Sequence, residues 1–173
     1  MNSISTPHAL PNSLSKPAKL LIWALTLYIA FVFIQSLFFK FTNSPETHYI
    51  FGTLNAWGAS LGFAGLFAPS GIFSQYVVGS TELVASCLLL VGLFFVKPLT
   101  HALGALMALG VISGAIFFHL ATPLGVQVRN TDGTLDGGEL FALACGVWLA
   151  AAIILYLRRT AILAVAHRFA RRA

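Results

Sequence analysis

The sequence has few charged residues: only 9% of its 173 residues are Asp, Glu, Lys or Arg, whereas a soluble domain carries roughly a quarter. By contrast, 58% of the residues are hydrophobic. A soluble domain of this size leaves about a third of its unfolded chain's surface exposed, and much of that surface must be polar. The composition therefore excludes an ordinary water-soluble domain and indicates that the solvent is lipid.

Cysteine is also scarce. Cys87 and Cys145 lie in separate apolar runs without CxxC spacing, which argues against a thioredoxin-like site and a zinc site. The sequence contains no phosphate loop, nucleophile elbow or haem-type histidine pair. We therefore expect no metal site. The Lys and Arg residues flank apolar runs instead of forming a stripe, so we also expect no nucleic-acid partner. Whether the chain catalyses a reaction stays open, and a stand-alone enzyme is the less favoured interpretation.

Four apolar runs are each long enough to cross a hydrocarbon core of ~30 Å as an α-helix: about 20–40, 72–96, 99–120 and 138–157. We predict an all-α integral membrane four-helix bundle over residues 20–157, with a disordered cytoplasmic tail at 1–19 and a basic cytoplasmic tail at 158–173. We expect residues 160–173 of that tail to form a basic amphipathic helix on an anionic membrane face. In the first outer loop, Ser44, Pro45 and Glu46 are typical of a helix start. Apolar residues follow at helical spacing as far as Gly58, which predicts a short interfacial helix.

The basic residues predict the orientation, because positively charged flanks stay in the cytoplasm. Only Lys40 and Arg129 fall on the other side. Eight of the ten lie on one side: Lys16, Lys19, Lys97, Arg158, Arg159, Arg168, Arg171 and Arg172. We therefore predict a multi-pass protein of the cytoplasmic (inner) membrane with both ends in the cytoplasm. The predicted partners are the lipid bilayer, membrane or redox proteins and further copies of the chain.

Glu82 lies inside the second predicted span. A carboxylate at membrane depth costs ~2.5–3.5 kcal/mol on insertion scales, so such residues usually face a cavity or a partner. We predict a role in ligand binding or proton handling, with Lys40 and His119 as partners. The alternative is a packing role, with Glu82 protonated or hydrogen-bonded to Thr81, Ser86 or another helix.

The other four acids fall on the outer side in this topology. Asp136 and Glu139 stand at the start of the fourth span, where acids favour a helix N-terminus and capping is one sufficient role. His119 ends the third span, either as an ordinary interfacial histidine or as a proton-exchange group. We predict one outward-opening pocket lined by Lys40, Glu82, His119, Asp136 and Glu139.

Small residues recur along the third predicted span. Gly110 and Gly114 form a GxxxG pair, and Gly104 with Ala108 continues a small face. Small residues let helix backbones approach closely in membranes. We therefore expect this face to contact another helix.

Six short stretches carry a family resemblance through their order and spacing: 38–42, 44–46, 49–51, 79–83, 114–120 and 136–141. In these stretches the sequence resembles the DoxX-like family of small four-helix membrane proteins. Family members have an acidic residue in the second helix, as Glu82 is here, and a His-Leu end to the third, as His119-Leu120 is here. Glu139 departs from the family pattern.

The resemblance implies a four-helix bundle in the cytoplasmic membrane, loosely associated with quinone-linked or thiol-linked redox systems. One hypothesis is therefore a redox-associated accessory subunit whose outward pocket binds a quinone-like ligand. The alternative is a non-enzymatic assembly or stress-response protein whose buried polar residues are structural. A small carrier is less favoured, because four helices with one deep acid offer few inverted-repeat features.

Overall fold

The computed structural model describes residues 14–130 and 132–170, without the side chains of residues 166, 168 and 169. Its helices are α1 (Lys16–Phe41), α2 (Pro45–Ser60), α3 (Gln75–Phe94), α4 (Pro98–Ala121) and α5 (Glu139–Ala170). Within the described residues, the β-structure is limited to one isolated bridge between Arg129 and Leu135. The prediction of an all-α fold is confirmed.

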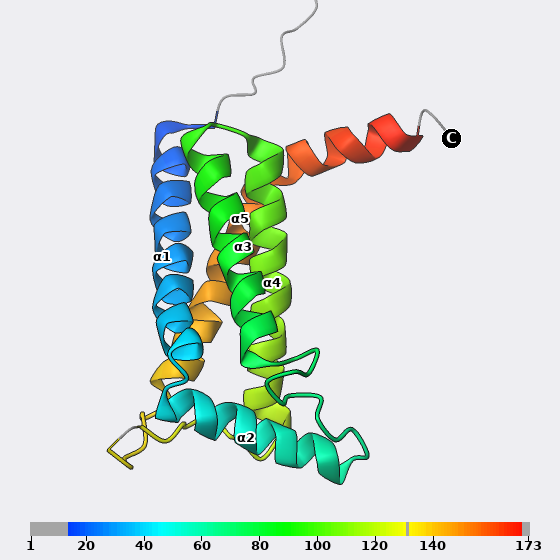
Figure 1. Ribbon diagram of the computed structural model, residues 1–173. Coiled ribbons are helices and arrows are strands. Elements are labelled where there is room, and N and C mark those ends of the chain that lie inside the picture. The colour runs from blue at the N-terminus through cyan, green and yellow to red at the C-terminus, as the bar shows by residue number, and fades with distance from the viewer. Residues whose placement is uncertain (1–13, 131, 171–173) are drawn as a thin grey trace, which may run out of the picture.

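Four of these helices are long and apolar enough to cross a membrane: Lys16–Phe41, Gln75–Phe94, Pro98–Ala121 and Glu139–Val165. They stand side by side as a bundle, and α2 lies across one end of it, here called the α2 end (Figure 1). The start of α1 and the connection between α3 and α4 lie at the opposite end. The chain is thus a multi-pass membrane protein with an even number of spans.

Serine residues begin three of the helices. The hydroxyls of Ser15, Ser44 and Ser74 each accept a hydrogen bond from the main-chain N–H three residues later, which satisfies one of the free donors of a helix start. Because Ser15 caps α1, that helix begins four residues before the predicted span. The rest of the predicted N-terminal tail, residues 1–13, lies outside the described residues, as do residues 171–173 of the basic tail.

The bundle is arranged so that α3 packs against α1 and α4, and α5 packs against α4 and α1. The seam between α1 and α5 is the most sparsely packed of the four. Its main polar contact is the hydroxyl of Tyr28, which donates to the carbonyl of Leu143 at 3.2 Å. The core between the helices is aliphatic apart from Phe33.

Close helix packing occurs at Gly92 and Gly104. A Cβ on Gly92 would lie 2.3 Å from the main-chain nitrogen of His101, and one on Gly104 would lie 2.6 Å from a main-chain nitrogen of α3. A Cβ on Gly110 or Gly114 would meet nothing within 4 Å. The prediction that the GxxxG pair forms a packing face is wrong, because sequence spacing shows which residues share a face and not what that face meets.

The helix α5 continues beyond the predicted fourth span. Its last part runs sideways from the end opposite α2, away from the bundle axis (Figure 1). Ile162 and Leu163 in this part are exposed. This segment therefore takes no part in the bundle core.

Candidate functional site

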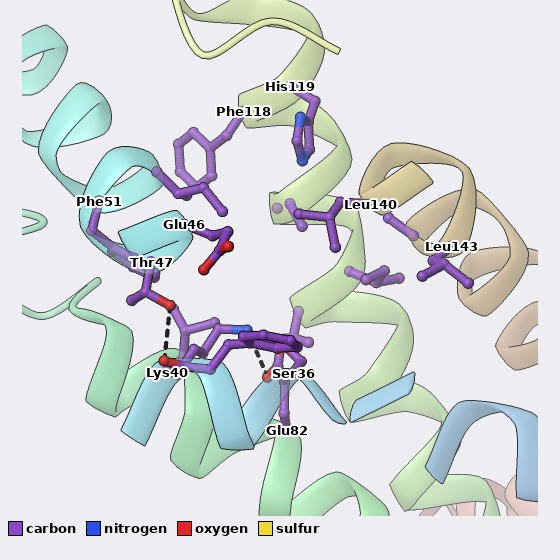
Figure 2. Close-up of a pocket in the computed structure, with 18 of the residues that line it drawn as sticks. Ser36, Lys40, Glu46, Thr47, Phe51, Glu82, Phe118, His119, Leu140 and Leu143 are labelled. Atoms are coloured by element: carbon purple, nitrogen blue, oxygen red, sulfur yellow. Dashed lines mark hydrogen bonds and ion pairs between the residues drawn. The ribbon is translucent and has the colours of Figure 1, made fainter. Parts of the chain in front are cut away.

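A cavity of about 530 Å³ lies between the bundle helices at the α2 end. Its walls come from all five helices and from the loops that follow α2 and α4, and most of the lining side chains are apolar. The polar or charged lining residues are Gln35, Ser36, Lys40, Glu46, Thr47, Glu82, His119, Asn130, Asp136 and Glu139. Figure 2 shows α2 on one side of this space and α4 and α5 on the other. All five predicted site residues line this one cavity.

Lys40 and Glu82 form an ion pair across the α1–α3 contact. The Lys40 Nζ lies 3.1 Å from Oε1 and 2.9 Å from Oε2 of Glu82, and it also donates to the hydroxyl of Ser36. The side chains are only 14% and 7% exposed, respectively. A buried carboxylate thus has a buried cation as its partner, as the sequence predicted for Lys40.

The contact between α1 and α3 positions this ion pair. Gly79 stands one turn before Glu82, and a Cβ there would lie 3.4 Å from the Lys40 stem. The buried side chain of Gln75 donates to the carbonyl of Lys40 at 3.0 Å and to Asn43 at 2.9 Å. These hydrogen bonds hold the end of α1 against the start of α3, so the ion pair has a fixed backbone on both sides.

The helix α2 covers the cavity. Thr47 is buried, and its hydroxyl donates to the carbonyl of Phe39 at 3.0 Å, which ties α2 to the end of α1. The carboxyl group of Glu46 points into the cavity (Figure 2). Ile50 and Phe51 add apolar surface from the same helix. The cavity therefore has a lid that combines an apolar face with one carboxylate.

His119 lies on the α4 wall and is 7% exposed. Its Nδ1 is 2.7 Å from the carbonyl of Gly125. Because a carbonyl only accepts, Nδ1 carries the proton in this contact, and Nε2 is the nitrogen that is left to accept in the neutral ring. The edge of the ring meets Phe141. Lys40 and His119 were the two partners predicted for Glu82. Among the described residues Glu82 pairs with Lys40, and no hydrogen bond joins it to His119.

Asp136 caps the start of α5. Its Oδ1 accepts from the main-chain N–H groups of Val128 (2.8 Å) and Gly138 (2.9 Å), and its Oδ2 accepts from that of Leu140 (3.1 Å). Burial raises the pKa of this carboxyl, but these N–H donors and the nearby His119 outweigh burial, and the pKa lies below its usual range. The capping role is present whatever else Asp136 does.

Glu139 occupies the first turn of α5 and is exposed. It lines the cavity together with the exposed Leu140, while Gln35 and Phe39 are exposed lining residues of α1. These four residues belong to the end of α1 and the start of α5. The cavity thus has exposed lining residues at the ends of these two helices.

The sequence reasoning missed several polar lining residues, namely Gln35, Ser36 and Thr47, and it treated Glu46 only as a helix-start residue. A signal for Ser36 was present: it is a polar residue in an apolar run, four residues before Lys40, and residues at that spacing meet on one helix face. The inward position of Glu46 and Thr47 depends on how α2 folds back over the bundle. Nothing local in the sequence reports that placement.

A second buried polar contact lies in the half of the bundle away from α2. The hydroxyl of Thr26 and Nε2 of His101 are 2.9 Å apart, and both residues are 0% exposed. Nδ1 of His101 and Nε of Arg158 are buried and have no hydrogen-bond partner among the described residues. This half therefore holds polar groups whose bonding is incomplete.

Comparisons of the chain with protein-family models, with curated proteins and with solved structures give no match.

Proposed function

We propose that this chain is a redox-associated accessory subunit of the cytoplasmic membrane that binds a small quinone-like ligand in the cavity at its α2 end. The observation that carries the proposal is the Lys40–Glu82 ion pair in the wall of a mostly apolar cavity of about 530 Å³. Ligand sites are typically apolar spaces of this size with a few placed polar groups. The resemblance to the DoxX-like family supports the choice of a quinone-linked system.

The chemistry of the wall suits a quinone. A quinone ring is flat and apolar and carries carbonyl oxygens that accept hydrogen bonds, which the Lys40 ammonium group donates. In the proposal, Glu82 and His119 exchange protons with the ligand. The electrons come from a partner redox protein, so this chain supplies binding and proton exchange and is not an enzyme by itself.

The proposal includes an orientation. Five basic residues lie in α1, in α5 or in the connection between α3 and α4, toward the end opposite α2: Lys16, Lys19, Lys97, Arg158 and Arg159. The positive-inside rule assigns that end to the cytoplasm. The cavity then opens on the outer side.

A cavity-filling variant tests the proposal. Gly114 lines the cavity, and a Cβ there meets nothing within 4 Å. Gly114→Leu therefore starts its side chain in open space, takes up ligand space and replaces a poor helix former with a good one. The measurement is the shift in unfolding temperature of the purified protein with a short-chain benzoquinone. We expect a shift for the unchanged chain and its loss in Gly114→Leu.

The matched control is Gly52→Leu. Gly52 is also helical with nothing within 4 Å of its Cβ position, but it does not line the cavity. This variant should keep the quinone-dependent shift. Unchanged protein that carries no quinone and shows no quinone-dependent shift would overturn the proposal, as would an equal shift in Gly114→Leu.

The second candidate is a non-enzymatic assembly or stress-response protein. It is favoured by the saturation of the ion pair, since Lys40 bonds Glu82 and Ser36 and joins α1 to α3. The double variant Lys40→Met/Glu82→Leu separates the two candidates, because buried ion pairs are often replaceable by apolar residues without loss of stability. If the double variant accumulates normally and keeps the quinone-dependent shift in unfolding temperature, the ion pair is structural. If it accumulates normally but loses that shift, the ligand role stands.

A further inference from the structure

We infer that the end of the bundle opposite α2 holds a binding site for the phosphate group of an anionic phospholipid, centred on Arg158 with His101 behind it. This inference is independent of the proposed ligand in the cavity. It starts from a cation that has no acidic side chain paired with it among the described residues, and from the incomplete bonding of two buried groups.

His101 is a buried histidine with only one of its two ring nitrogens hydrogen-bonded among the described residues. The imidazole is 0% exposed, and Nε2 is taken by the hydroxyl of Thr26 at 2.9 Å. The backbone of α3 presses against it at Gly92, which leaves no room for a side-chain partner from that residue. Nδ1 therefore stays without a partner among the described residues. A buried polar atom without a hydrogen bond costs about 1–3 kcal/mol and calls for an explanation.

Arg158 is a half-buried cation without an ion-pair partner among the described residues. It lies on α5 within electrostatic range of His101, and its Nε is buried without a partner among the described residues. A guanidinium that is partly removed from water is normally paired with an anion. The chain contains five acids in all. None of them pairs with Arg158: Glu82 bonds Lys40, Asp132 and Asp136 lie in the loop before α5, and Glu46 and Glu139 line the cavity at the α2 end.

The position of Arg158 selects the anion. Arg158 lies two turns before Val165, where the membrane-spanning part of α5 ends, and Ile162 and Leu163 after it are exposed. The last part of α5 runs sideways from the bundle (Figure 1). A helix of this kind lies in the headgroup region of a bilayer. Lys97 and Arg159 at the same end are exposed and add positive charge. Phosphate groups of lipids are the anions found at that depth, and arginine binds phosphate through a planar fork of donors.

The roles of the two residues differ. The terminal nitrogens of the half-buried Arg158 guanidinium meet the lipid phosphate, which supplies the anion that this cation lacks, while Nε stays buried. His101 stays behind it. In the proposed site Nε2 accepts from the Thr26 hydroxyl, 2.9 Å away, and the proton is on Nδ1, so the buried end of the site is lined by donors. An anion at the Arg158 guanidinium would then be stabilised from both groups, and the apolar tails would lie along α5.

The test uses the full-length chain, purified and stripped of lipid in a neutral detergent. Phosphatidylglycerol, phosphatidylcholine with the same acyl chains, and inorganic phosphate are titrated separately, and lipid binding is counted by native mass spectrometry. Both lipids carry a phosphodiester, but the choline cation of phosphatidylcholine offsets its charge and is repelled by Arg158. We therefore expect phosphatidylglycerol to bind about tenfold more tightly than phosphatidylcholine, and Arg158→Gln to remove most of that preference. Millimolar inorganic phosphate should displace little of the lipid.

The matched control is Arg159→Gln, which removes the same charge one residue away. The Arg159 side chain is exposed and lies over the Tyr156 ring, 4.1 Å from its centre. Its variant should change the preference by no more than about twofold. Equal losses in the two variants would show a diffuse electrostatic effect and would overturn the site, as would equal binding of the two lipids or full displacement by inorganic phosphate.

If Arg158→Gln does not fold, Arg158→Lys keeps the charge and removes the planar fork. This variant should retain a reduced preference, since a lysine offers only a point charge to phosphate. An unchanged preference in Arg158→Lys would overturn recognition by the guanidinium. The lipid series on the unchanged chain decides between the anionic headgroup and no headgroup selectivity whatever the variants do.

Discussion

The two ends of the bundle bury polar contacts of opposite character. At the α2 end, Lys40 and Glu82 pair with each other beside an open cavity. At the other end, Thr26 and His101 meet in a tightly packed place where the α3 backbone touches His101 at Gly92. The first contact is complete and has space next to it, whereas the second is incomplete and has none. The free space beside the Lys40–Glu82 pair can hold a ligand. The packed half has no such space, so a ligand there can bind only at the surface of the bundle.

The ion pair should give the largest effect. Glu82→Leu leaves the Lys40 ammonium buried with Ser36 as its remaining partner, and breaking one side of a buried pair typically costs about 3–5 kcal/mol. The double variant Lys40→Met/Glu82→Leu should recover most of this loss. Thermal unfolding in detergent measures both variants. Equal instability of the single and double variants would contradict the account of an uncompensated charge.

The packing at the opposite end comes next. Gly92→Ala places a Cβ 2.3 Å from the His101 main-chain nitrogen, so α3 and α4 must separate. Overpacking of this kind costs about 1–3 kcal/mol. The variant should lower the unfolding temperature and leave any response to benzoquinone intact. A normal unfolding temperature would mean that the two helices separate there without cost.

Asp136 gives a smaller, pH-dependent effect at the α2 end. Because its pKa is depressed in the folded chain, its contribution to stability is present above the ordinary aspartate pKa and is lost as the pH falls toward the depressed value. Asp136→Ala should cost roughly 1 kcal/mol through the lost cap. Unfolding measured from neutral pH downward should show a shallower decline in Asp136→Asn than in the unchanged chain. Parallel pH curves for the two proteins would contradict this assignment.

The smallest effect should be a gain. Gly114→Ala adds a Cβ in open space on a helix and should stabilise the chain by roughly 0.5–1 kcal/mol. The same substitution at Gly92 is destabilising, so the two glycines on neighbouring helices should respond with opposite signs. The measurement is the unfolding temperature of Gly114→Ala and of Gly92→Ala, each compared with the unchanged chain. Shifts of the same sign and size would contradict the contrast between an open and a packed end of the bundle.

Much of the fold was predictable because a bilayer imposes simple requirements. A helix that crosses the hydrocarbon core needs about 20 apolar residues, so the four runs predicted α1, α3, α4 and the bundle part of α5 to within a few residues. The sequence also predicted a helix after residue 160, and the structure joins it to the fourth span as one helix. The start of α2 was also local information, since Ser44 and Pro45 act on the backbone next to them. Convergence of Lys40 and Glu82 was predictable in outline, because a deep carboxylate needs a partner.

The sequence by itself therefore determined the spans, the helix starts and the need for a partner for Glu82, since these follow from hydrophobic length, capping and the cost of a buried charge. Only the tertiary structure decided which partner Glu82 takes, that Gly110 and Gly114 face a cavity while Gly92 and Gly104 meet a neighbour, and that α2 brings Glu46 over the ion pair. The rotation of each helix about its axis and the seam left loosely packed depend on contacts among all the helices. No local pattern in one of them contains that information.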